Sequence, residues 1–316
     1  MTQRKQCVVG SAGRLRPDVV APQGSLTIGG RRRTFITVSG RIRQRRPALV
    51  LMLHGTMQTA RNIRPFAGYS FDTYAVGGRV VVIYPDAIRR EWNGARKAMM
   101  LSERAKHIDD LGFIRGVIGH AVAAENVDPT KVFVAGFSLG GQMAIRLIHE
   151  IPELLAGAAV LSANLPSPDN FVVDRDAELA LPVLTIHGTA DPLAPFNGGA
   201  VGFHGHLLKG IHLSAPETAR YFAARNGITG APTITQLPHQ RVPGKPTSVA
   251  RHDYARPGGL PVRFYTVHGG GHVLPNPTHT FAQWFWGPST RDICAADAVA
   301  DFFGLPVAIP GREATT

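Results

Sequence analysis

Short continuous runs of apolar residues recur along the chain. Their length is typical of strands that are covered on both faces, as in a parallel sheet. The runs occupy residues 47–53, 79–84, 131–137, 158–162, 183–187 and 262–267. Between them, apolar residues return at steps of three and four over residues 106–125, which indicates an amphipathic helix, and helical spacing is also present in residues 59–75 and after residue 138. Strands that alternate with helices predict an α/β fold with a mainly parallel central sheet flanked by helices.

The ends of the chain and three long segments depart from this alternation. Residues 25–38 alternate between apolar and polar around Gly29-Gly30, which predicts an N-terminal antiparallel hairpin. We expect a single domain over residues 1–316, with residues 1–23 as a flexible tail. The irregular segments are residues 165–181, 192–214 and 238–260. The first two follow strand ends, where a parallel sheet places its ligand crevice, so they are predicted rim loops and residues 192–214 a possible lid. The third is predicted to be an excursion before the last strand.

Charge adds little to this picture. The chain has 34 Lys and Arg against 22 Asp and Glu, for a net charge of +12. Such a surface could attract nucleic acid or another polyanion. The arginines are scattered apart from the runs at residues 31–33 and 41–46, and no nucleic-acid-binding motif accompanies them. We therefore expect a solvated basic face and no specific nucleic-acid partner.

The two cysteines, Cys7 and Cys294, exclude a disulfide scaffold. The pattern leaves open whether they pair with each other. Neither lies in a cluster of metal ligands, so we expect no metal and no cofactor. No run of 18 apolar residues predicts a membrane span. The first 20 residues lack the apolar stretch of a signal peptide, so the sequence as written predicts a cytoplasmic protein, or a secreted one if a leader was removed.

The clearest chemical motif is Gly-Phe-Ser-Leu-Gly at residues 136–140. A buried strand precedes it and a helix follows, which is the context of a nucleophile elbow. In such an elbow the glycines permit a sharp turn, and the hydroxyl of Ser138 stands above the sheet. The alternative is a glycine-rich turn in which Ser138 only caps the helix.

A serine hydroxyl needs a base within hydrogen-bond reach. His272 follows three glycines in the loop after the last predicted strand, while His268, at the strand end, is the rival. The acid that orients the base should follow another strand end between serine and histidine, and Asp191 has that position. Its alternatives in a polar loop are Asp169, Asp174 and Asp176.

Acyl transfer also needs backbone N–H donors for the oxyanion. We expect one from Leu139, directly after the nucleophile, and the other from Thr56, with Met57 as runner-up. Around this centre we expect substrate contacts from His54, Met57, Gln58, Trp92, Phe196 and Leu274. Trp92 could equally pack in the core, and for Trp284 and Trp286 core packing is favoured.

These pieces together resemble the esterase family of polyhydroxybutyrate depolymerases and feruloyl and acetylxylan esterases. The similar segments are LMLHGTMQTA at 51–60, VVVIYPDA at 80–87, HIDDLGFIRGVI at 107–118, VFVAGFSLGGQMA at 132–144, LTIHGTADPLAPF at 184–196 and GGGHVLP at 269–275. The resemblance implies the α/β-hydrolase fold, a Ser138–Asp191–His272 triad and an oxyanion hole at Thr56 and Leu139. Family members often have Cys in place of Thr56 and Trp in place of Leu274, so substrate does not transfer from any one member.

The sequence thus favours a serine carboxylic ester hydrolase that forms an acyl-enzyme without a metal. Its substrates would be hydroxyalkanoate oligomers, feruloyl or acetyl esters on polysaccharides, or small acyl esters. One alternative is a serine peptidase on the same fold. The other is a non-catalytic protein that binds a polymer through its basic face. The sequence gives no indication of oligomeric state.

Overall fold

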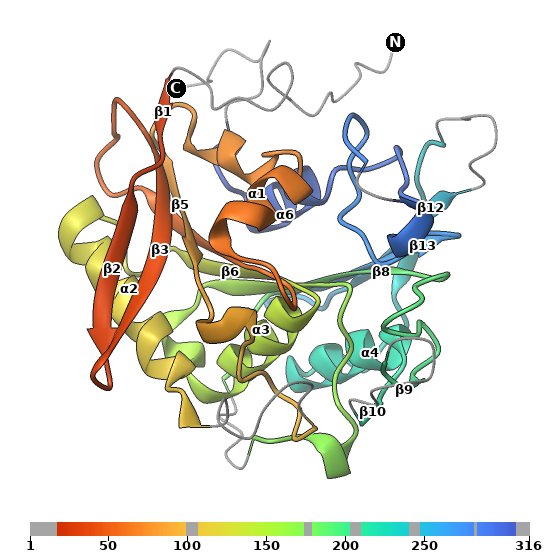
Figure 1. Ribbon diagram of the computed structural model, residues 1–316. Coiled ribbons are helices and arrows are strands. Elements are labelled where there is room, and N and C mark those ends of the chain that lie inside the picture. Colours follow the sequence, from red (N-terminus) through yellow and green to blue (C-terminus); the bar gives the residue numbers. More distant parts are fainter. Residues whose placement is uncertain are drawn as a thin grey trace, which may run out of the picture.

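A computed structural model describes residues 18–98, 107–173, 179–202, 210–239, 247–280 and 283–307. Within these residues, eleven strands form one sheet in the order β1-β3-β5-β4-β6-β7-β8-β13-β12-β11, with β2 also paired to β3 (Figure 1). The strands are β1 (Val19–Val20), β2 (Gln23–Ile28), β3 (Arg31–Gly40), β4 (Ala48–Leu53), β5 (Val80–Pro85), β6 (Val132–Phe137), β7 (Gly157–Leu161), β8 (Val183–Gly188), β11 (Thr233–Gln236), β12 (Ser248–Tyr254) and β13 (Val262–His268). A separate antiparallel pair consists of β9 (Gly199–Ala200) and β10 (Ile211–His212).

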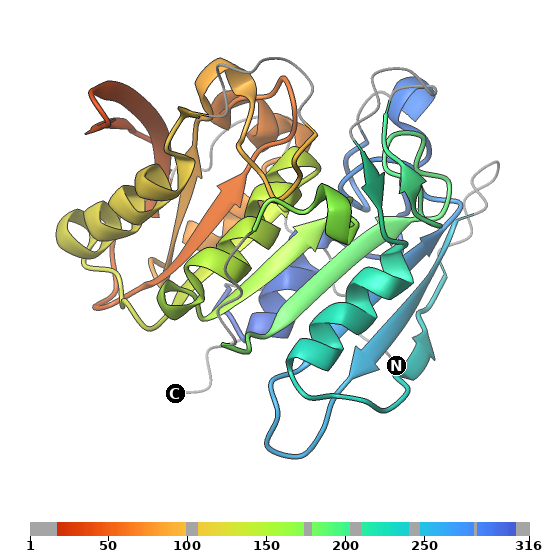
Figure 2. The same cartoon turned by 90° about the horizontal axis from the view of Figure 1, so that it is seen from below.

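The helices lie on both faces of the sheet. They are α1 (Ala60–Phe66), α2 (Asp110–Glu125), α3 (Leu139–Glu150), α4 (Ala215–Arg225), α5 (Gln283–Trp286) and α6 (Ala295–Phe303), with short 3₁₀ turns at Phe71–Ala75, Ile88–Arg90, Pro152–Leu154 and Pro168–Asn170. Helices α2, α3 and α4 cover one face, and α1 and α6 cover the other (Figures 1 and 2). Each face has its own apolar core: Leu51 and Phe113 belong to the first, and Val50 and Val299 to the second.

The centre of the sheet is parallel, because each strand from β5 to β13 along the sheet pairs in parallel with its neighbour. Every residue of β4, β5 and β6 is buried. This explains why the strands read as unbroken apolar runs, since helices exclude water from both of their faces. The predicted α/β fold with a mainly parallel sheet is confirmed.

The N-terminal hairpin is confirmed as β2 and β3, which pair antiparallel along their length. Its turn requires glycine, since Gly29 and Gly30 have φ angles of 54° and 73°. The predicted solvated basic face is wrong at one position. Arg33 is buried, pairs with Asp110 of α2 at 2.6 Å and lies over the ring of Phe113, so it ties the hairpin to a helix.

Two boundaries drawn from the sequence need correction. The predicted tail over residues 1–23 extends too far, because Val19 and Val20 pair with β3 and β2 begins at Gln23; residues 1–17 lie outside the described part. The segment 238–260 is more than an excursion, since it contains β12, which pairs antiparallel with the whole of β13. Cys294 is buried, and Cys7 lies outside the described residues.

Candidate active site

Ser138 lies in the sharp turn between β6 and α3. Its backbone has φ 55° and ψ −115°, a strained conformation for a residue with a side chain. Glycines make this turn possible: a Cβ atom on Gly136 would lie 2.0 Å from the Gly140 carbonyl oxygen, and one on Gly140 would lie 2.2 Å from the Leu53 carbonyl oxygen. The Ser138 side chain makes no capping hydrogen bond to α3, which argues against a role limited to helix capping.

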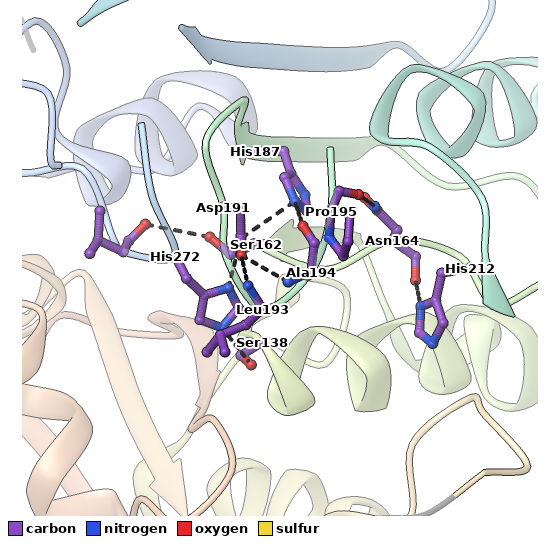
Figure 3. A network of polar contacts seen from close by, with 11 residues as sticks. Ser138, Ser162, Asn164, His187, Asp191, Leu193, Ala194, Pro195, His212 and His272 are labelled. Carbon is purple, nitrogen blue, oxygen red and sulfur yellow. Dashed lines mark hydrogen bonds and ion pairs between the residues drawn. The ribbon is translucent and has the colours of Figure 1, made fainter. Parts of the chain in front are cut away.

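The structure brings His272 to this serine. His272 Nε2 lies 2.9 Å from Ser138 Oγ, and His272 Nδ1 lies 2.7 Å from Asp191 Oδ2 (Figure 3). Because a carboxylate only accepts, Nδ1 carries the proton, and Nε2 is left to accept from the serine hydroxyl. The backbone N–H of His272 donates to the carbonyl of Trp286, whose indole stacks on the imidazole with ring centres 5.8 Å apart. These two contacts with Trp286 thus hold the glycine-rich loop in place.

Asp191 is buried but well supplied with donors. Its Oδ1 accepts the amides of Leu193 and Ala194 at 2.9 and 2.8 Å, while Oδ2 faces His272 and lies 3.5 Å from His187 Nε2. Burial by itself favours the neutral acid, but His272, and to a lesser extent His187 and the Ala194 amide, outweigh it and hold the pKa of Asp191 below its usual value. Asp191 therefore stays ionised opposite the imidazole.

His187 is a buried neighbour of this carboxylate. Burial lowers the pKa of His187, although Asp191 opposes that change. Its Nε2 donates to the Ala194 carbonyl at 2.8 Å, which stabilises the same turn that supplies amides to Asp191 (Figure 3).

Two backbone amides beside Ser138 are available to an oxyanion. Within the described part of the chain, the amides of Thr56 and Leu139 donate to no other residue. The runner-up, Met57, donates its amide to the Arg90 carbonyl at 3.1 Å and is therefore occupied. The loop of Thr56 approaches the serine closely, since a Cβ on Gly55 would lie 3.3 Å from the Ser138 Cβ.

Ser138 and His272 open onto a cavity of about 800 Å³. Of the predicted substrate contacts, Met57 and Gln58 line it, as do Thr56 and Leu139. Arg61, Phe66, Arg96, Gln142, Ser162, Asn164, Val201, Phe285 and Trp286 also contribute to the wall. These residues come from the helices α1, α3 and α5 and from the loops that contain Arg96, Ser162, Asn164 and Val201.

The other four predicted contacts need correction, because His54, Trp92, Phe196 and Leu274 do not line the cavity. His54 is fully buried; burial lowers its pKa to about 4, and its Nδ1 donates to the Gly55 carbonyl. The buried Trp92 donates its indole N–H to the His54 carbonyl. His54 and Trp92 therefore support the loop that contains Thr56 and do not line the cavity.

Phe196 and Leu274 do not line the cavity because both pack in apolar surroundings. Phe196 packs against the apolar core and stacks on Phe264, with ring centres 6.2 Å apart. Leu274 is buried in the core on the opposite face of the sheet. Apolar packing thus accounts for both side chains.

The rival base His268 and the rival acid Asp169 do not reach this centre. His268 is exposed at the end of β13, and Asp169 is exposed in the 3₁₀ turn Pro168–Asn170. Asp174 and Asp176 lie outside the described residues.

Comparison with known proteins identifies the family of this chain. A family described as Phospholipase/Carboxylesterase matches residues 94–207. "Putative esterase NocK" of Nocardia uniformis subsp. tsuyamanensis is 33% identical over 260 residues, which cover 80% of this chain and 73% of that protein. The chain belongs to this esterase family of the α/β-hydrolase superfamily. The resemblance seen in the sequence is confirmed.

Two further relatives extend the comparison. Feruloyl esterase B of Piromyces equi is 28% identical over 171 residues, or 52% of this chain, but the match spans only 29% of that larger protein. The solved acetyl xylan esterase of Aspergillus awamori superimposes over 90% of this chain and 99% of its own, with a TM-score of 0.57 and 15% identity. At that identity the likeness shows the fold alone.

The esterase has several cavity residues that the sequence did not single out. Gln142 and Asn164 are buried polar residues that belong to no recognisable motif. Ser162 has a positive φ of 51°, which the sequence pattern does not predict. Trp286 packs against the apolar core as expected, and it also stacks on His272 and lines the cavity. Arg96 is the most unexpected, since a buried arginine cannot be recognised from its neighbours in sequence.

Two further features are absent from the described part of the esterase. No three His, Cys, Asp or Glu side chains gather there as a metal ion would require. No helix among the same residues is long and apolar enough to cross a bilayer.

Proposed function

We propose that the protein hydrolyses carboxylic esters through a covalent acyl-enzyme, with Ser138 as nucleophile, His272 as general base and Asp191 as the residue that orients the base. The observation that carries this proposal is the continuous chain of hydrogen bonds from Ser138 Oγ through both nitrogens of His272 to Asp191. A serine, a base and an orienting carboxylate in this arrangement activate a hydroxyl that is otherwise a weak nucleophile.

Each proton in the reaction has a place in this geometry. Ser138 Oγ attacks the ester carbonyl carbon while His272 Nε2 takes the hydroxyl proton, and Asp191 stabilises the imidazolium. The bond to the alcohol oxygen then breaks, and His272 returns the proton to the leaving alcohol. A water molecule, deprotonated by His272, attacks the acyl-serine, which releases the acid and restores the Ser138 hydroxyl.

The amides of Thr56 and Leu139 act as the oxyanion hole. Both are free to donate; Leu139 directly follows Ser138, and Gly55, next to Thr56, lies close to it. Leu139 also begins α3, so the positive end of the helix dipole adds to the stabilisation. Loss of one such donor typically raises the barrier by about 3 to 4 kcal/mol.

The substrate classes we propose are hydroxyalkanoate oligomers, feruloyl or acetyl esters of polysaccharides, and small acyl esters. Among curated relatives, a feruloyl esterase and a poly(3-hydroxyalkanoate) depolymerase of Paucimonas lemoignei support this range. Met57 and Gln58 are the proposed contacts from the Thr56 loop. Phe66 and Trp286 supply apolar side chains to the wall of the same cavity.

A panel of p-nitrophenyl esters from acetate to decanoate, with hydroxybutyrate and ferulate included, tests the proposal. We expect wild-type hydrolysis and its loss by about 10³-fold or more in Ser138→Ala and His272→Ala. A fluorophosphonate probe should label the wild type and not Ser138→Ala. Ser162→Ala is the matched control: Ser162 lines the same cavity, but its Oγ faces the Val273 carbonyl at 3.4 Å, so labelling should persist.

Amide substrates and a polyanion-binding measurement, added to these assays, separate the alternatives. Faster cleavage of aminoacyl amides than of matched esters would favour a peptidase. Absence of labelling, together with salt-sensitive binding to a polyanion, would favour a binding protein.

A further inference from the structure

Arg96 is a buried cation in the wall of the cavity that contains Ser138. Its relative exposure is 7%. Among the described residues, its guanidinium makes neither a hydrogen bond nor an ion pair. No side-chain nitrogen of Arg96 is both enclosed and unpartnered, unlike Nε of Arg33, so each keeps some accessible surface, and Arg96 lines the cavity. An unpartnered charge that faces a cavity needs an explanation, since buried charges are normally paired.

The backbone holds Arg96 firmly in this place. On one side the amide of Ala95 donates to the Gln142 carbonyl at 3.0 Å, and on the other the amide of Lys97 donates to the Asn170 carbonyl at 2.6 Å. Gln142 in turn donates its own amide to the Ser138 carbonyl, so it lies one turn of α3 from the nucleophile. One helical turn rises about 5.4 Å, which is the scale of a short acyl chain.

The charge on Arg96 survives its burial. Burial lowers the pKa of Arg96 to about 10, while the charge of Glu91 opposes that change from a distance greater than an ion pair. The guanidinium is therefore still protonated at neutral pH. In a cavity with a largely apolar wall, its attraction for an anion is much stronger than it would be in water.

We propose that Arg96 binds a carboxylate of the substrate, so that the preferred esters carry a free carboxylate away from the bond that Ser138 attacks. This inference rests on the proposed function and names its substrate class. A guanidinium matches the two oxygens of a carboxylate, and a single buried cation matches a single negative charge. Among the described wall residues Arg61 is the only other arginine or lysine, and it is exposed. A half-ester of a dicarboxylic acid fits this description, because its acyl chain ends in a carboxylate.

Two p-nitrophenyl esters test the inference, because they differ only at the end of the acyl chain. Mono-p-nitrophenyl glutarate ends in a carboxylate, and p-nitrophenyl pentanoate ends in a methyl group. We expect wild-type kcat/KM to favour the glutarate ester, and the ratio of the two kcat/KM values to fall by about tenfold or more in Arg96→Met. Arg96→Lys should give an intermediate ratio. Arg61→Met, the exposed control, should change the ratio by less than about threefold, because water screens its charge.

A binding measurement does not depend on turnover. In Ser138→Ala, glutarate should raise the melting temperature more than the neutral glutaramide does, and adding Arg96→Met should remove the difference. If the wild type hydrolyses no ester but glutarate still raises the melting temperature more than glutaramide does, the esterase mechanism is rejected and the anion site is retained. Unchanged ester ratios in Arg96→Met would overturn the role of Arg96. Should Arg96→Met not fold, equal inhibition of the wild type by glutarate and glutaramide would overturn it too.

Discussion

Asp191 is an ionised group in a nearly dry environment, and its surroundings explain how that is possible. Two amides of its own turn and the imidazole of His272 supply hydrogen bonds to both carboxylate oxygens. Each of these donors comes from the loop after β8 or the loop after β13, which are adjacent parallel strands. The charge of one residue therefore links two loops.

This linkage predicts a pH dependence of stability. The pKa of Asp191 in the folded protein lies below its usual value of 3.8, so its contribution is present above that value and is lost as the pH falls through the folded pKa. We expect the wild type to melt at a higher temperature than Asp191→Asn from about pH 5 to 7, and the gap to narrow as the pH falls toward about 3. Thermal melts of both proteins across this range check it, and a gap that is constant or widens in acid would contradict it.

At the scale of single residues, the sequence predicted the triad better than it predicted the residues that line the cavity around it. Ser138 and Asp191 were identifiable because each follows an apolar strand, where the chain order and the motif restrict the choice. For Trp92 the sequence left substrate contact and core packing equally open, since proximity in sequence to a strand end does not say which way a side chain points; the side chain is buried. Arg96 had no signal at all, because backbone contacts with residues distant in sequence, Gln142 and Asn170, hold it at the cavity.

Among elements, the junction of β6 and α3 is packed very closely beside the candidate site. Gly136 and Gly140 approach backbone atoms so closely that neither has room for a methyl group. The elbow, the first turn of α3 and the end of β4 are thus one packed unit. Its geometry fixes the direction of the Ser138 hydroxyl.

Gly140→Ala should disturb this unit. The added methyl would meet the Leu53 carbonyl oxygen at 2.2 Å, so we expect a melting temperature lower by several degrees and loss of most esterase activity. Gly119→Ala is the matched control in α2, where a Cβ has open space and alanine is the better helix former. That variant should be as stable as the wild type or slightly more stable, with full activity; equal effects from the two substitutions would show that the clash at Gly140 is not decisive.

The elements that the sequence predicted and those that it missed differ in how deeply their residues are buried. The central strands were visible because both faces are buried and their residues are almost all apolar. β12 was missed, since it includes Arg251, His252 and Asp253, which are only half-buried near the sheet edge. Helix α4 begins with a capping box at Ser214 and Glu217, a local signal that an apolar-run analysis does not detect.

The cavity is a property of the whole molecule. Its wall combines the Thr56 loop, the start of α3, the loop after β7, the β9–β10 segment and α5, which are far apart in sequence. No single segment predicts its size. The predicted rim loops at 165–181 and 192–214 contain or adjoin wall residues such as Asn164 and Val201, whereas a lid motion of residues 192–214 stays a prediction, and residues 203–209 lie outside the described part.

Filling the cavity from the β9–β10 side should change chain-length preference. Val201 is buried and lines the cavity, so Val201→Trp should reduce kcat/KM for decanoate esters by about tenfold relative to acetate esters. The control Ile211→Trp changes an exposed residue of β10 that does not line the cavity, and it should leave the profile as it is. The ester panel measures both. A parallel loss for all chain lengths in Val201→Trp would mean that the substitution disturbs the fold and not the acyl space.

The strained backbone of Ser138 has a consequence for how the protein can change over time. A residue with φ 55° and ψ −115° is in a region that suits glycine far better than serine, at an expense of roughly 1 to 3 kcal/mol. Selection for stability alone would therefore replace this serine with glycine, and selection for activity must continually oppose that drift. A lineage that no longer needs the reaction would be expected to lose its hydroxyl here first, while the sheet and its helices persist.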